Sequence, residues 1–144
     1  MTDTSLAPVL YVEDEENDVV LMRLAFKRAG VAHPLRIASD GKEALEYLSA
    51  VNRSADFIDR SPCLVLLDLN LPRVSGFEVL QRARQMLVFK ELPIIIFSSS
   101  AELSDKERAR ELGATDYIVK PTSVGGFVNV ANELKHRWLM MCER

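Results

Sequence analysis

Residues 64–72 read Leu64-Val65-Leu66-Leu67-Asp68-Leu69-Asn70-Leu71-Pro72, a short apolar run that ends in a carboxylate. Four consecutive apolar residues are typical of a strand that is buried on both faces of a parallel sheet. A carboxylate directly after such a strand, here Asp68, is costly unless it is hydrogen-bonded, paired or bound to a metal. The stretch therefore predicts a buried central strand with a functional carboxylate at its end.

Four more apolar runs lie along the chain, and amphipathic segments follow them. The runs cover residues 9–12, 35–38, 94–97 and 117–119. Helices are expected at about 17–29, 41–48, 75–87, 104–113 and 126–140, from their apolar periodicity and their start and stop signals. This alternation predicts an α/β fold, in which a five-stranded parallel sheet has helices on both faces.

Local signals set the expected boundaries. Gly30 is a helix stop, and capping boxes begin at Asp40 and at Ser104. Residues 51–62 are expected to form a mobile surface loop. Four residues of the first helix should share its buried face: Val20, Leu21, Leu24 and Ala25.

Length and composition indicate one soluble domain. The chain has 144 residues, 48% of them hydrophobic and 27% charged, with a net charge of −3. The acidic balance argues against a nucleic-acid partner, and the apolar runs are too short to span a membrane. Cys63 and Cys142 form no CxxC, and no signal peptide precedes the first run, so we expect reduced thiols and a cytoplasmic location. The domain should cover 1–144, with its core at about 8–138 and a tail of the last helix at 139–144.

Polar residues follow four of the runs, at the edge of a parallel sheet where ligands bind. They are Glu13-Asp14, Asp68, Ser98-Ser99-Ser100 and Lys120-Pro121. Two facing carboxylates require a cation, and oxygen ligands favour Mg²⁺. With Lys120 as a second positive charge, the set suits phosphoryl transfer to an aspartate.

Each placement also has a structural alternative. Asp68 could cap a turn, and the acidic residues 13–16 could simply begin a helix, a reading that suits Glu15 and Glu16. The serines could form an ordinary loop, and Lys120-Pro121 could be a strand exit. The conjunction at one sheet edge favours a site.

The motifs resemble those of the receiver domain of two-component response regulators, from about residue 8 to residue 138. They are Val-Glu-Asp at 12–14, residues 66–72, Gly76, Ser98 and Tyr-Ile-Val-Lys-Pro at 117–121. The resemblance implies a flavodoxin-like (βα)5 three-layer sandwich with strand order 2-1-3-4-5. The length of 51–62 and the ending at 134–139 look like single-domain regulators that are partnered with bacterial phytochromes.

The resemblance also implies roles for single residues. Asp68 matches the phosphoacceptor. Glu13 and Asp14 match the acidic pair that holds Mg²⁺, with Asp14 binding directly and Glu13, where Asp is commoner, acting through water. Asn70 matches the residue whose backbone carbonyl is a metal ligand. Mn²⁺ or Ca²⁺ could replace Mg²⁺.

Four further residues match the catalytic and switch positions. Lys120 matches the lysine that pairs with the phosphoryl group, and Ser98, where Thr is commoner, matches the hydroxyl that swings toward it. Tyr117 matches the aromatic residue that turns inward in response. Pro121 matches a proline whose peptide bond is typically cis.

The expected function is that of a stand-alone response regulator. A histidine kinase, of the bacterial-phytochrome type on the finer match, would phosphorylate Asp68, and the chain would catalyse its own phosphorylation and dephosphorylation without being an enzyme otherwise. The surface of the fourth and fifth helices would change and signal to a downstream protein or phosphotransferase. The apolar segment 138–141 favours a homodimer through the last helix.

Three other functions are alternatives for this sequence. A degenerate receiver would bind partners without phosphorylation, but the site residues are intact. A haloacid-dehalogenase-like phosphatase needs a second Asp where this chain has Asn70. A flavin-binding protein of this fold needs a phosphate cradle that the loops lack.

Overall fold

A computed structural model describes residues 2–54 and 61–142. Its five parallel strands form one sheet in the order β2-β1-β3-β4-β5, which confirms the expected fold and strand order. The strands are β1 (Val9–Val12), β2 (Leu35–Ala38), β3 (Leu64–Leu67), β4 (Ile94–Ser98) and β5 (Asp116–Val119). Every residue of β1, β3 and β4 is buried, as their continuous apolar runs predicted.

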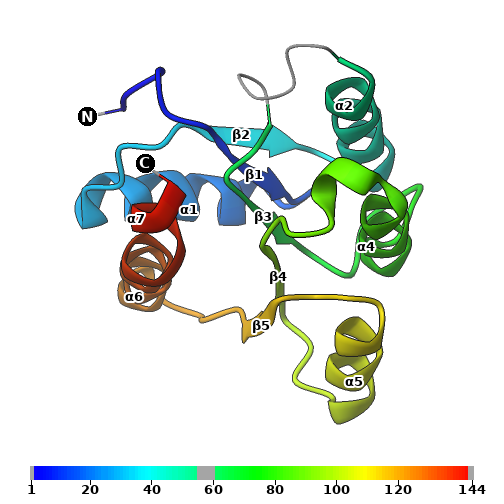
Figure 1. Ribbon diagram of the computed structural model, residues 1–144. Helices are drawn as coiled ribbons and strands as arrows, with labels where there is room; N and C mark the ends of the chain where they lie inside the picture. The colour runs from blue at the N-terminus through cyan, green and yellow to red at the C-terminus, as the bar shows by residue number, and fades with distance from the viewer. Residues whose placement is uncertain (1, 55–60, 143–144) are drawn as a thin grey trace.

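Helices cover both faces of the sheet (Figure 1). They are α1 (Glu16–Ala29), α2 (Gly41–Arg53), α4 (Gly76–Gln85), the short η1 (Leu87–Phe89), α5 (Leu103–Glu111) and α6 (Val124–Leu134), which continues through η2 (Lys135–Leu139) and α7 (Met140–Cys142). One core cluster lies under α2 and α4 and includes Leu48 and Leu80, and the other lies under α1 and α6 and includes Met22 and Phe127. No helix in the described part of the chain is long and apolar enough to cross a bilayer.

Two of the predicted helix boundaries are confirmed and one is wrong. Gly30 ends α1 with φ 70°, in the left-handed region that glycine tolerates, and its N–H donates to the Lys27 carbonyl at 3.2 Å. The Asp40 carboxylate caps α2 by accepting from the Glu43 N–H at 2.8 Å. Ser104 begins no capping box, because α5 has already started at Leu103 and lacks a side-chain cap.

Other expectations shift by a few residues. Helix α2 runs to Arg53, so Val51 is helical and 1% exposed instead of belonging to a loop; residues 55–60 of that expected loop lie outside the described residues. The buried stripe of α1 is formed by Met22, Ala25 and Phe26, whereas Val20 is 63% exposed. The last helix begins at Val124, where Ser123 caps it by accepting from a backbone N–H.

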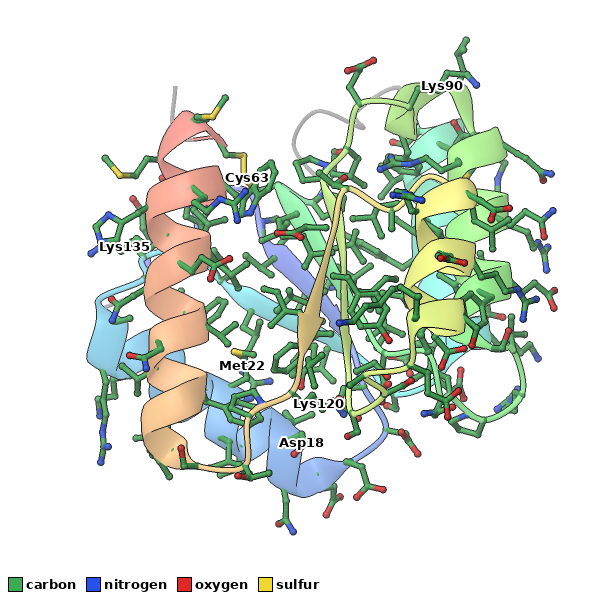
Figure 2. All side chains as sticks on the ribbon, turned by 90° about the horizontal axis from the view of Figure 1, so that it is seen from below. Asp18, Met22, Cys63, Lys90, Lys120 and Lys135 are labelled. Atoms are coloured by element: carbon green, nitrogen blue, oxygen red, sulfur yellow. A yellow bond between two sulfur atoms is a disulfide. The ribbon has the colours of Figure 1, made fainter. Side chains whose placement is uncertain are left out.

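A disulfide joins Cys63 and Cys142, 79 positions apart, with their Cα atoms 6.0 Å from each other. Figure 2 shows the sulfur–sulfur bond beside the Cys63 label. Cys63 directly precedes β3, at the edge where the strands begin, and Cys142 ends the last helix, which returns along the sheet to that same edge. The expectation of two reduced thiols was therefore wrong, because sequence spacing does not show which distant segments the fold brings together.

Candidate functional site

The predicted site residues gather at the carboxyl edge of the sheet, where backbone hydrogen bonds continue past the strand ends. The Asp68 N–H donates to the Val12 carbonyl at 3.2 Å, which fixes Asp68 against the end of β1. The Lys120 N–H donates to the Ser98 carbonyl at 2.8 Å, which fixes Lys120 against the end of β4. These backbone hydrogen bonds therefore set the distances between the strand ends that carry Asp68 and Lys120.

Three carboxylates form an acidic group at this edge. Glu13, Asp14 and Asp68 each offer an oxygen atom, and these atoms lie within 4.8 Å of one another. Asp14 is exposed, whereas Glu13 is 1% and Asp68 4% exposed. A set of oxygen ligands with one side open to solvent fits a hard divalent cation such as Mg²⁺, which keeps several waters. The Asn70 N–H donates to Asp68 Oδ1 at 3.3 Å, and the metal-binding role of its carbonyl stays a prediction.

Both oxygens of Glu13 are already in contact with protein groups. Oε1 lies 2.7 Å from Lys120 Nζ and accepts from the Tyr11 hydroxyl at 3.1 Å. Oε2 accepts from the Glu15 N–H at 3.2 Å. The prediction that Asp14 binds a metal directly and Glu13 acts through water is favoured by this arrangement, because Asp14 alone of the pair is exposed.

The ammonium group of Lys120 lies among three carboxylates. Its distances are 2.7 Å to Glu13 Oε1, 2.8 Å to Asp18 Oδ2 and 3.1 Å to Asp68 Oδ2. Asp18, in the first turn of α1, was not predicted from the sequence as a site residue. Acidic residues are common in a first turn because they complement the helix dipole, so nothing local distinguishes Asp18 from Glu16.

Burial and charge shift the protonation equilibria of this cluster. Burial above all, and to a lesser extent the charge of Asp68, raises the pKa of Glu13 to about 7, against the opposing hydrogen bond from Lys120. Burial lowers the pKa of Lys120, but hydrogen bonds to Asp18 and Glu13 outweigh it, so the net shift is upward. The ammonium therefore stays charged, and the surrounding carboxylates exceed it in number.

Ser98 and Tyr117, the predicted switch pair, are linked through Ser100. The Ser98 side chain is fully buried and its Oγ accepts from the Ser100 N–H at 3.3 Å. The Tyr117 hydroxyl donates to the Ser100 carbonyl at 2.8 Å. Movement of Ser98 Oγ would thus release a backbone group beside the Tyr117 contact.

Pro121 departs from the expectation that came with the resemblance. No peptide bond within residues 2–54 and 61–142 is cis, so the expected cis-proline is wrong and the Lys120–Pro121 bond is trans. Trans is the lower-energy isomer of an X–Pro bond by about 0.5–1 kcal/mol. The ring packs against α6, where a Cβ built on Gly126 would lie 2.3 Å from Pro121 Cβ.

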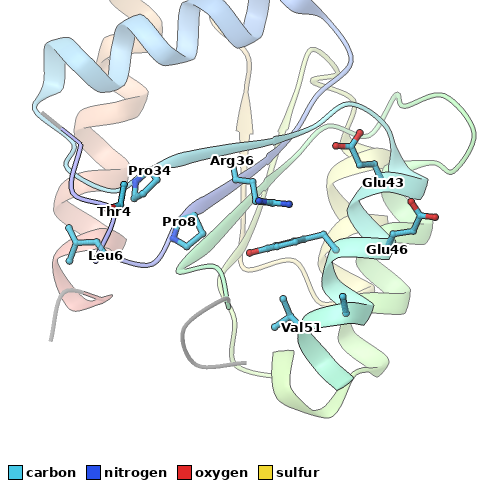
Figure 3. A pocket seen from close by; sticks show the side chains of 10 residues that line it. Thr4, Leu6, Pro8, Pro34, Arg36, Glu43, Glu46 and Val51 are labelled. Atoms are coloured by element: carbon cyan, nitrogen blue, oxygen red, sulfur yellow. The ribbon is translucent and has the colours of Figure 1, made fainter. Parts of the chain in front are cut away.

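A hollow of about 650 Å³ lies away from this edge, between the N-terminal segment, β2 and α2 (Figure 3). The Arg36 guanidinium lies over the Tyr47 ring, 4.4 Å from its centroid. Thr4, Pro8 and Pro34 line the opposite side. None of the predicted site residues lines this hollow, and the chemistry is concentrated at the strand ends instead.

Comparisons with known proteins find similar sequences and structures over nearly the whole chain. The model of the response regulator receiver domain family matches residues 9–132. Response regulator Rcp1 of Synechocystis sp. is 30% identical over 141 residues, which cover 96% of this chain and 95% of Rcp1. The crystal structure of Mn²⁺-bound Rcp1 gives a TM-score of 0.78 at 28% identity, over 92% of this chain and 94% of that chain.

Two more solved structures are similar over nearly the whole chain. Response regulator RPA3017, described in red light signalling of R. palustris, gives a TM-score of 0.82 at 36% identity, over 93% of this chain and 94% of that one. The phosphorylated cyanobacterial phytochrome response regulator RcpA also gives 0.82, at 28% identity, over 94% and 96%.

Proposed function

This chain belongs to the response regulator receiver domain family, and we propose that it is a stand-alone regulator that accepts a phosphoryl group from a histidine kinase on Asp68. One observation supports this above all: the buried Asp68 carboxylate lies in one acidic group with Glu13 and Asp14, 3.1 Å from the Lys120 ammonium. A carboxylate is a competent nucleophile where nearby cations can neutralise the incoming oxygens.

The proposed transfer is a single displacement at phosphorus. An oxygen atom of Asp68 forms a bond to phosphorus while the bond from phosphorus to the donor imidazole nitrogen breaks. The imidazole nitrogen keeps the electron pair, and the product is an acyl phosphate on Asp68. Lys120 then donates to a phosphoryl oxygen. The chain catalyses its own phosphorylation and dephosphorylation in this scheme by positioning these groups, and we expect no activity on other substrates.

The acidic group suits a divalent cation in this function. Glu13, Asp14 and Asp68 would hold Mg²⁺, together with the Asn70 carbonyl. Bound there, the ion would supply positive charge to the phosphoryl oxygens. Mn²⁺ is a reasonable substitute, since the similar protein Rcp1 has been solved with Mn²⁺ bound.

The switch would begin at Ser98. Its hydroxyl would turn from the Ser100 N–H to the phosphoryl group, and Tyr117, which now donates to the Ser100 carbonyl, would change position with it. The altered surface would be formed by α5, β5 and α6, the fourth and fifth long helices and the strand between them. The phosphoryl charge would shift the populations of two states that exist beforehand.

We propose a histidine kinase of the bacterial-phytochrome type as the partner that donates the phosphoryl group. RcpA is described as a phytochrome response regulator and RPA3017 as part of red light signalling, and both resemble this chain along nearly their full lengths. The activated surface would act on a downstream protein or phosphotransferase.

A homodimer through the last helix is a further part of the proposal. Met140 and Met141, at the end of that helix, are 55% and 64% exposed, and contiguous exposed apolar side chains often mark interfaces. Sedimentation at high concentration, with and without beryllium fluoride, should show a dimer. A monomer under both conditions would exclude it.

The experiment that tests the phosphorylation uses acetyl phosphate with Mg²⁺ and intact mass as the readout. The wild type should gain one phosphoryl group, and Asp68→Asn should gain none. Glu78→Gln is the matched control, because it removes a carboxylate in the first turn of α4 that pairs with the exposed Arg82 and lies outside the acidic group; it should be phosphorylated as the wild type is. No adduct on the wild type, even with beryllium fluoride, would favour the degenerate receiver instead.

A further inference from the structure

The Lys120 ammonium has no hydrogen-bond capacity left in this structure. An ammonium group has three donors, and Lys120 Nζ lies within 3.1 Å of one oxygen from each of three carboxylates: Glu13, Asp18 and Asp68. Figure 2 shows the labelled Asp18 and Lys120 next to each other, at the end of the sheet where α1 begins. Phosphorylation of Asp68 replaces its own contact with Lys120 by one to a phosphoryl oxygen, so Lys120 can donate to a second phosphoryl oxygen only if Glu13 or Asp18 gives up its contact.

Of these two carboxylates, Asp18 can be displaced at the lower cost. The side chains of Glu13 and Asp68 are 0% and 6% exposed, whereas that of Asp18 is 24% exposed, so water can solvate Asp18 after it leaves the lysine. Glu13 would lose its partner in a buried place, where an unpaired charge is expensive. Asp18 also lies outside the acidic group of Glu13, Asp14 and Asp68.

We propose that Asp18 is a positioning residue that holds Lys120 in the unphosphorylated state and competes with the phosphoryl group for it. The inference rests on the proposed function of Asp68. The contact between Asp18 and Lys120 stabilises the unphosphorylated chain, and its loss is part of the cost of phosphorylation. Asp18 therefore lowers the affinity of the site for a phosphoryl group.

The substitution Asp18→Asn separates this role from a purely structural one. It keeps the shape of the side chain and removes its charge. The unliganded variant should unfold at a lower urea concentration, because the lysine loses a partner. The same variant should bind beryllium fluoride, a phosphoryl mimic, about 3–5-fold more tightly, the upper part of the range expected for a partly exposed ion pair. If Asp18 had a purely structural role, its replacement would lower both the stability to urea and the affinity for beryllium fluoride.

The matched control is Glu16→Gln. Glu16 is also an acidic residue in the first turn of α1, and it is exposed, so it tests the general effects of net charge and of the helix dipole. Its beryllium fluoride affinity should stay within about 2-fold of the wild type, as expected for a surface charge that solvent and salt screen. Asp18→Glu restores a carboxylate and should return the affinity toward the wild-type value.

The measurement is calorimetric titration with beryllium fluoride in the presence of Mg²⁺, on the full chain of each variant, alongside urea unfolding without ligand. Tighter binding by Asp18→Asn alone, with lower stability, supports the proposal. Unchanged or weaker binding by Asp18→Asn, where the wild type binds well, overturns it and leaves the proposed function intact. The same gain in Glu16→Gln overturns it as well. A wild type that binds no beryllium fluoride would contradict the proposed function. The role of Asp18 would then also be lost, because no phosphoryl group would compete with it for Lys120.

Discussion

Replacing Gly76 by alanine should displace the phosphoacceptor strand. Gly76 is the first residue of α4, and its N–H donates to the Leu69 carbonyl at 3.0 Å. A Cβ at this position would lie 2.1 Å from the carbonyl oxygen of Asp68 and 2.7 Å from Leu69 Cα. Both neighbours are backbone atoms, so no flexible side-chain tip can move aside.

The expected magnitude follows from this geometry. The Asp68 carbonyl oxygen would have to move by about 1 Å to relieve the overlap, and overpacking of this kind typically costs about 1–3 kcal/mol. The Asp68 N–H is bound to Val12 in the central sheet, which resists such a movement. The higher helix propensity of alanine recovers at most about 1 kcal/mol. We expect a net loss of about 1–2 kcal/mol in the free energy of unfolding.

Urea unfolding measures this loss, and Gly125→Ala is the matched control. A Cβ on Gly125, in the first turn of α6, would meet no atom within 4 Å, so this variant should be up to about 1 kcal/mol more stable than the wild type. Phosphorylation by acetyl phosphate should slow in Gly76→Ala and stay unchanged in Gly125→Ala. If the two variants proved equally stable, the close approach of α4 to Asp68 would not constrain the residue at position 76.

Two further predictions concern the ion cluster. Lys120→Met removes the cation shared by three carboxylates, so the metal-free chain should lose about 3–5 kcal/mol of unfolding free energy. Mg²⁺ should recover part of this loss. An unchanged urea midpoint would show that the Lys120 ion cluster does not stabilise the fold. The pKa of Glu13 is raised by burial from 4.5 to about 7, so the folded metal-free chain binds a proton that the unfolded chain releases. This contribution to stability is full below pH 4.5 and is lost as the pH rises through 7. Thermal unfolding should show that decline in the wild type and a flatter profile in Glu13→Gln, and equal slopes would assign the titration to another group.

The sequence alone determined the sheet and most of the site residues at the carboxyl ends of its strands. Continuous apolar runs fixed β1, β3 and β4 as buried strands, because a strand covered on both faces has no polar side to alternate with. The polar residues that follow those runs, among them Asp68 and Lys120, could then be placed at one edge, since parallel strands end on the same side. The caps at Gly30 and Asp40 were also predictable, because a cap depends on neighbours within a few residues.

The features that were missed depend on contacts between distant parts of the chain. Asp18 and Lys120 are 102 positions apart, and Cys63 and Cys142 are 79 apart. In the sequence Asp18 is one more acid in a first helical turn, and it becomes a site residue only because α1 begins beside the end of β5. Periodicity and capping report the energy of a segment on its own, whereas the partner of a charge or a thiol is decided by which segments the packed core brings within a few ångströms.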